Sequence, residues 1–172
     1  MTYQGMMPAD QQDELVTQWN RSVQQVIDTR ELVEREGIEV ASISVGGTPN
    51  YDIVGSIPGV TEVVAGGYAL MDARYATTRP ELKPAAKVMT TVTSRPEPRR
   101  ALADAGQKSV GIDTGLPVID GVPGAYLEKM SAEHGWIYLE DESQQNLTIG
   151  TKVWLTPWDA GNCINLYDFI SA

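Results

Sequence analysis

Residues 38–68, IEVASISVGGTPNYDIVGSIPGVTEVVAGGY, contain two apolar runs that each lead into a pair of glycines. The first run, 38–44, alternates β-branched and small residues, and the second, 60–64, is also β-branched. Between them, residues 51–57 form an apolar segment of one or two helical turns that a Pro-Gly pair ends. Strands separated by helical segments are typical of parallel pairing in α/β proteins. We therefore expect two parallel strands, each followed by a glycine loop.

The two glycine loops are candidates for an anion site. Glycine permits close approach of the backbone, and consecutive N–H groups near the start of a helix attract phosphate. Because the carboxyl ends of parallel strands lie at one edge of a sheet, both loops should lie there. The alternative is that the glycines only permit tight turns. The candidate residues are Gly46, Gly47, Thr48, Gly66, Gly67 and Tyr68.

A long amphipathic helix is predicted on the N-terminal side, from Asp10 as its cap to Gly37 as its end. Its apolar residues recur at three- and four-residue spacing, as in Leu15, Trp19 and Val23. One helix cannot cover both faces of a parallel sheet, and such sheets are buried on both faces. Residues 1–72 are therefore expected to be part of a larger α/β structure.

The second half of the chain has strand character. Residues 73–84 show no periodicity and are the expected linker or crossover between 1–72 and 85–172. The region 85–172 is predicted to be a small, mostly antiparallel β-domain. Its expected elements are a hairpin of 87–93 with 100–104 around a turn at 96–98, and strands at 135–139 and 152–156 separated by the polar turn 140–146.

Composition excludes several classes of protein. Of the 172 residues, 42% are apolar and 21% are charged, as in globular chains. The net charge of −10 repels a phosphate backbone, so we expect no nucleic-acid partner. No apolar run approaches the roughly 18 residues of a membrane span, and residues 1–12 do not resemble a secretory leader, so a cytoplasmic protein is expected. One cysteine and one histidine exclude an internal disulfide and a His/Cys metal cluster.

Three polar segments outside the glycine loops carry groups capable of chemistry. His134 beside Glu133 is either an acid or base near neutral pH or part of a turn. Cys163 is either a nucleophile or, as is more common for a lone thiol, a small buried side chain. Asp104 and Lys108 have opposite charges four residues apart, and a polar network at a strand end is the alternative to a functional role.

Short motifs over nearly the whole chain resemble those of the D-threonine aldolases and the eukaryotic-type D-serine dehydratases. Their common order and compatible spacing carry the resemblance, since any one motif is weak. The motifs are Tyr3-Gln4-Gly5, Ser44-Val45-Gly46-Gly47-Thr48-Pro49, Pro58-Gly59-Val60-Thr61-Glu62-Val63, Gly66-Gly67-Tyr68, Met71-Asp72, residues 90–96 (TTVTSRP), Asp104-Ala105-Gly106-Gln107-Lys108, Asp113-Thr114-Gly115, Glu133-His134-Gly135 and Asn165-Leu166-Tyr167-Asp168.

The resemblance implies a fold and a cofactor. Members of this family have an alanine-racemase-like (β/α)8 barrel and use pyridoxal phosphate (PLP) to cleave or dehydrate β-hydroxy D-amino acids, typically with a divalent metal. It implies that residues 1–72 are the last βα elements of such a barrel and that 85–172 are the C-terminal β-domain. It also implies that the six glycine-loop residues hold the PLP phosphate.

The chain departs from the family pattern at two places. In the family, the lysine that forms the Schiff base with PLP lies on the first barrel strand, and none of the five lysines here matches it. Before its Asn-Leu-x-Asp segment the family has His-x-Cys or His-x-Asp, where this chain has Asp159-Ala160-Gly161. Asp159 therefore remains as the candidate ligand of a weak, degraded metal site.

These features predict the C-terminal portion of a PLP-dependent lyase that acts on β-hydroxy D-amino acids. We expect it to be inactive alone because the lysine-bearing segment is absent. The alternative is a non-catalytic remnant or interaction module. The expected partners are a second copy of the chain or a complementary chain with the N-terminal half-barrel, and a D-amino acid substrate in the complete enzyme.

Overall fold

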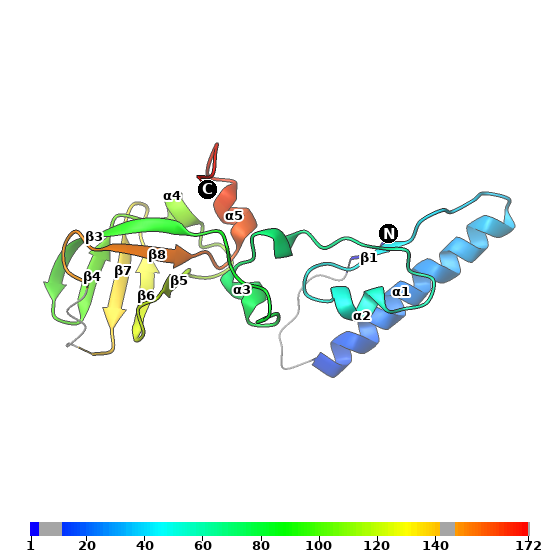
Figure 1. Ribbon diagram of the computed structural model, residues 1–172, viewed down its shortest axis with the longest axis horizontal. Coiled ribbons are helices and arrows are strands. Elements are labelled where there is room, and N and C mark those ends of the chain that lie inside the picture. Colours follow the sequence, from blue (N-terminus) through cyan, green and yellow to red (C-terminus); the bar gives the residue numbers. More distant parts are fainter. Residues whose placement is uncertain (4–11, 142–146, 172) are drawn as a thin grey trace. The chain divides into compact units, whose positions relative to one another are not determined.

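A computed structural model of the protein (Figure 1) describes residues 1–3, 12–141 and 147–171. The chain divides into two compact units, Met1–Ala69 and Leu70–Ala172. Asp10, the expected helix cap, and most of the expected turn 140–146 lie outside the described residues. No helix in the described part of the chain is long and apolar enough to span a membrane.

The first unit is built around the predicted amphipathic helix. Helix α1 runs over Gln12–Arg35, and Gly37 follows its end with a φ of +81°, a conformation that glycine adopts without strain. One face of α1 is buried against the apolar residues of the strands and of α2 (Tyr51–Gly55). The buried side chains of this cluster are Leu15, Trp19, Val23, Ile43, Val45 and Val54.

The expected parallel strands are present but short. β1 (Ser44–Val45) pairs in parallel with β2 (Glu62–Val63), and Thr2 pairs in parallel with Val45 on the other side of β1. The predicted strands 38–44 and 60–64 were therefore wrong over most of their lengths. Strand hydrogen bonds form only where two extended segments lie side by side. Ile38 lies beyond the end of the paired region and is 60% exposed.

The second unit is a six-stranded sheet in which all neighbouring strands are antiparallel. Its order is β5-β8-β3-β4-β7-β6, and the edge strands β5 and β6 contact each other, so the sheet curls until it nearly closes. The strands are β3 (Val88–Glu97), β4 (Arg100–Ala103), β5 (Val118–Asp120), β6 (Ala125–Met130), β7 (Gly135–Leu139) and β8 (Lys152–Thr156). The predicted strands 135–139 and 152–156 match β7 and β8.

The hairpin of β3 and β4 is confirmed, with its turn at Pro98 and Arg99 rather than at 96–98. The strands enclose an apolar core that includes Val92, Ile137 and Leu155. Three short helices complete the unit, and a 3-10 turn ends the first unit. These are α3 (Ala73–Ala76), α4 (Gln107–Val110), α5 (Ala160–Ile164) and η2 (Gly67–Ala69).

Thr90, which is buried, and Asp104, which is exposed, link β3 to the segment after β4. The Thr90 hydroxyl donates to the Asp104 carboxylate at 2.8 Å and accepts the Ala105 N–H at 3.0 Å. The Thr91 N–H donates to the same Asp104 oxygen at 2.8 Å. Asp104 therefore belongs to the polar strand-end network that was one of the two alternatives for this segment.

Replacement of Thr90 tests this network. Thr90→Val keeps the shape of the side chain but leaves the buried Ala105 N–H without its acceptor. We therefore expect the free energy of unfolding to fall by about 2 kcal/mol. Urea unfolding measures the change. Thr93→Val is the matched control, because Thr93 is exposed on the same strand, and its change should be within about 0.5 kcal/mol. Equal losses in both variants would contradict the role of Thr90.

The same network predicts a pH dependence. The Thr91 N–H is the largest cause that holds the pKa of Asp104 below its ordinary value of 3.8, with the Thr90 hydroxyl contributing. A depressed folded-state pKa gives stability that is present above the unfolded-state pKa and lost as the pH falls. Asp104→Asn should therefore lower the melting temperature at pH 7, and its difference from wild type should shrink as the pH falls below 3.8. The exposed Asp113→Asn control should track wild type over the same pH range.

Candidate functional site

A hydrogen bond joins the two glycine loops of the first unit. The Tyr68 backbone N–H donates to the Thr48 hydroxyl at 2.9 Å, and Thr48 is only 2% exposed. Since β1 and β2 are parallel, both loops leave the same edge of the sheet. The structure therefore places the loop after β1 next to the loop after β2, as the sequence analysis expected.

The loop after β1 uses part of its backbone to fix its own shape. The Gly46 N–H donates to the Thr2 carbonyl at 3.2 Å, and the Gly47 N–H donates to the side-chain oxygen of buried Asn50 at 2.9 Å. Gly46 has a φ of +72°, and a Cβ there would meet Val54 at 2.5 Å. Glycine at position 46 is thus required by the turn itself, and neither N–H is available to a ligand.

Other N–H groups in these loops have no acceptor in the described part of the chain. They belong to Thr48, Gly66 and Gly67, and the two glycines are consecutive at the start of η2. A Cβ built on Gly66 meets nothing within 4 Å, so the backbone there borders open space. Such donors fit a phosphate group. The site residues named from the sequence thus divide into a turn-forming set, Gly46 and Gly47, and a set with free N–H donors, Thr48, Gly66 and Gly67. The N–H of Tyr68 belongs to neither set, because it bonds to the Thr48 hydroxyl.

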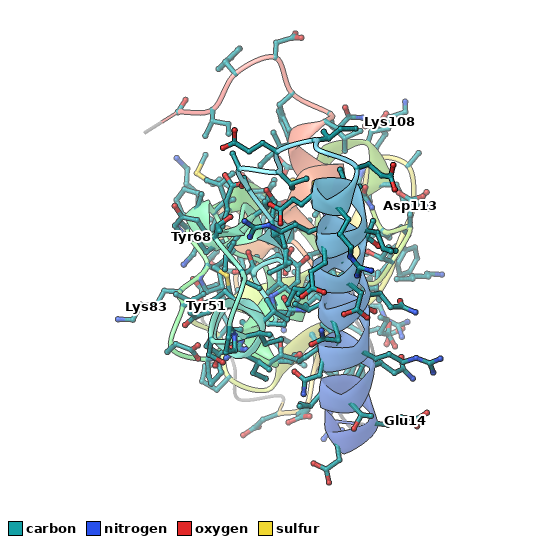
Figure 2. The ribbon with its side chains drawn as sticks, turned by 90° about the vertical axis from the view of Figure 1, so that its right-hand side faces the viewer. Glu14, Tyr51, Tyr68, Lys83, Lys108 and Asp113 are labelled. Carbon is teal, nitrogen blue, oxygen red and sulfur yellow. The ribbon has the colours of Figure 1, made fainter. Side chains whose placement is uncertain are left out.

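The first unit offers no lysine to a phosphate at these loops. All five lysines of the chain lie beyond residue 82, so residues 1–69 contain none. Tyr68, labelled in Figure 2, follows the two free N–H groups and is 57% exposed. The groups that the two loops themselves offer to a phosphate are backbone N–H dipoles and hydroxyl groups.

In the second unit, two aspartates cap helices α3 and α5 in a reciprocal arrangement. Asp72 caps α3 by accepting the Tyr75 N–H at 2.7 Å, and its other oxygen accepts the Ala160 N–H of α5 at 3.2 Å. Asp159 caps α5 by accepting the Asn162 N–H at 3.0 Å. The other oxygen of Asp159 lies 3.6 Å from the guanidinium of Arg74, which belongs to α3.

The residues around Asp159 do not fit a divalent metal. No group of three or more His, Cys, Asp or Glu side chains suited to a metal occurs among the described residues. Burial raises the pKa of the Cys163 thiol to about 11, which disfavours the thiolate that binds metals. His134 lies in the β6–β7 turn, in another part of the unit. Asp159 thus has the role of a helix cap.

The other polar candidates also have structural partners. The backbone carbonyl of His134 closes its turn by accepting the Ser131 N–H at 2.9 Å. Lys108, labelled in Figure 2, pairs with Glu133 at 2.6 Å rather than with Asp104. Cys163 is buried, so the structure favours its reading as a small core residue.

Three residues important to these arrangements had no assigned role in the sequence analysis. Asp72 stands three residues before Tyr75, which is the spacing of a helix cap and could have been recognised. Asn50 lies in a Pro-Asn turn, where a side chain commonly bonds to nearby backbone. Arg74 and Asp159 are 85 positions apart, and nothing local indicates their pairing.

The sequence is similar to that of known enzymes. Residues 85–172 match the family described as "Putative serine dehydratase domain". A D-threonine aldolase from Arthrobacter sp. is 32% identical over 142 residues, which cover 80% of this chain and 37% of that protein. A 3-hydroxy-D-aspartate aldolase from Paracoccus denitrificans (strain Pd 1222) is 28% identical over 177 residues, which cover 97% of this chain and 45% of that protein.

Solved structures agree with this relationship. The D-threonine aldolase from Filomicrobium marinum has a TM-score of 0.84 and 30% identity, with 91% of this chain and 44% of that chain covered. An alanine-racemase-like protein from Idiomarina loihiensis has a TM-score of 0.74 at 24% identity, which supports the fold alone, with 90% of this chain and 45% of that chain covered.

The chain spans less than half the length of these relatives. The family match covers 88 of its 172 residues. The chain therefore belongs to the D-threonine aldolase and D-serine dehydratase-like family, of which it matches the C-terminal part, with the last βα elements of an alanine-racemase-like barrel followed by an antiparallel β-domain.

Proposed function

We propose that this chain is the phosphate-binding portion of a PLP-dependent lyase for β-hydroxy D-amino acids. When bound, PLP acts as an electron sink for bond cleavage next to the substrate amine. The residues that would hold its phosphate are Thr48, Gly66 and Gly67, with Tyr68 beside them. The aldolases similar to this chain support the substrate class, which is carried over here as part of the proposal.

The observation that carries the proposal is the hydrogen bond from the Tyr68 N–H to the Thr48 hydroxyl. It holds two glycine loops together at the carboxyl edge of parallel strands, the place where barrel enzymes commonly bind phosphate. Neighbouring N–H groups of Gly66 and Gly67 are then left without an acceptor within the described residues. A tight turn alone needs no such pair of free donors.

Catalysis would require a lysine from a different polypeptide segment. The lysines of this chain lie in the second unit, and two of them are engaged there: Lys87 pairs with Asp120, and Lys108 pairs with Glu133. Activity and D-amino acid binding are therefore proposed for an assembly with a complementary half-barrel chain.

The second candidate function is a non-catalytic interaction module. Strand β2 has β1 as its paired neighbour, and among the described residues no further strand pairs with it. Val64, which follows β2, is 43% exposed. An unpaired strand edge is a template for another chain. Under this alternative the glycine loops need not bind phosphate, so ligand binding separates the two functions.

A charge at Gly66 tests phosphate binding. Gly66→Asp places a carboxylate beside the free N–H groups, and the open space there lets the fold accept it. We expect the chain to bind PLP, with inorganic phosphate competing, and Gly66→Asp to weaken this binding at least about tenfold. Isothermal titration calorimetry measures both affinities.

Gln25→Glu is the matched control, because it adds the same charge on the exposed face of α1. Its affinity for PLP should equal that of the wild type, and both variants should keep the wild-type melting temperature. Phosphate-independent binding, with pyridoxal binding as tightly as PLP, would contradict the assignment of these loops.

Borohydride reduction tests the missing lysine. The chain alone, incubated with PLP and reduced, should show no single stoichiometrically modified lysine in peptide mapping, because none of its lysines lies in the unit with the phosphate loops. D-Threonine and D-serine should not be turned over. Turnover by the isolated chain, together with one modified lysine, would refute the proposed dependence on a second segment.

A further inference from the structure

We infer that Arg74 takes the electrostatic place of a divalent metal at Asp159, so that the α3–α5 junction is held by an internal cation. The junction is the reciprocal cap formed by Asp72, Arg74 and Asp159. It lies wholly within the second unit and does not depend on cofactor binding.

The carboxylate oxygens of the junction are already engaged. Asp72 accepts one N–H from α3 and one from α5, and it is only 3% exposed. Asp159 accepts the Asn162 N–H with one oxygen and faces Arg74 with the other. A metal ion would have to displace one of these partners, and removal of a cap destabilises the helix.

Arg74 is held in position from several directions. Its backbone N–H donates to the Trp158 carbonyl at 3.3 Å, and the preceding Ala73 N–H donates to the Pro157 carbonyl at 2.9 Å. Its guanidinium carbon lies 5.4 Å from the centre of the Tyr75 ring. The backbone bonds therefore fix the start of α3 against the segment that carries Asp159, which brings the guanidinium to the carboxylate.

A second cation at Asp159 would be repelled by the first. The Arg74 and Asp159 side chains are 29% and 22% exposed, so water screens their attraction only in part. A guanidinium remains charged at any ordinary pH and presents several donors. Zinc sites normally need three or more protein ligands, and here the neighbouring position of the motif is Gly161.

A double-mutant cycle with Arg74→Gln and Asp159→Asn in the full chain measures the pair. Asn is as good a helix cap as Asp, so Asp159→Asn removes the charge and keeps the cap. We expect each single variant to lower the melting temperature by about 3 °C and the double variant to lower it by about the same amount, because the singles remove one interaction. Arg74→Lys should recover part of the loss, and high salt should shrink it.

The corresponding cycle at Arg35 and Glu31, an exposed pair on α1, is the control and should show a coupling near zero. Calorimetry with zinc and manganese chloride, and melting with and without EDTA, provides the second readout. Wild type should show no one-to-one binding at micromolar concentration and no shift with EDTA. Additive losses at Arg74 and Asp159 would overturn the inference, as would tight metal binding that Asp159→Asn abolishes.

Discussion

The parallel pairing of β1 with β2 is the constraint on which the first unit depends. In its register Ser44 lies opposite Glu62 and Val45 opposite Val63, so the loops that follow β1 and β2 leave the sheet at the same edge. Two-residue strands contribute little by themselves, so burial of Val45 against α1 must hold the pairing in place. A change of register would separate Thr48 from the Tyr68 N–H, and the glycine loops would then be two unrelated turns.

Much of this fold could be predicted from the sequence, and the failures have local causes. Helix α1 and strand β7 have strong, regular apolar patterns. Strand β5 was missed because its three residues are too few to show alternation. Strand β6, AYLEKM, was missed because it contains helix-forming residues and because a bulge between Leu127 and Lys129 breaks its period. The opposite error occurred at 38–44, where a strand was predicted but most of the residues are unpaired. A high strand propensity does not ensure that a neighbouring strand is present to pair with.

The candidate site was predictable to a similar degree. Glycine pairs after strands indicated the loops, but the sequence could not tell which N–H groups would remain free. That division depends on Asn50, whose side chain takes the Gly47 N–H, and on the Thr48 hydroxyl, which takes the Tyr68 N–H. In the second unit, Asp159 was recognised as a carboxylate without the usual ligands beside it. Its partner Arg74 was not recognised, because two residues that are distant in the sequence produce no local sequence pattern when they form an ion pair.

The Arg74–Asp159 pair also explains why a degraded metal motif need not be a damaged fold. An aspartate that stands at a metal-ligand position without companion ligands adds a charge there, and a partly buried charge without a partner is destabilising. The helix cap satisfies one oxygen of Asp159, and the guanidinium of Arg74 faces the other. Both partners are carried by segments that the backbone already holds together through the Pro157 and Trp158 carbonyls. Because the Arg74 guanidinium is part of the chain, its presence at Asp159 does not depend on the concentration of a metal ion. Helices α3 and α5 can therefore remain joined whichever metal ions are in solution.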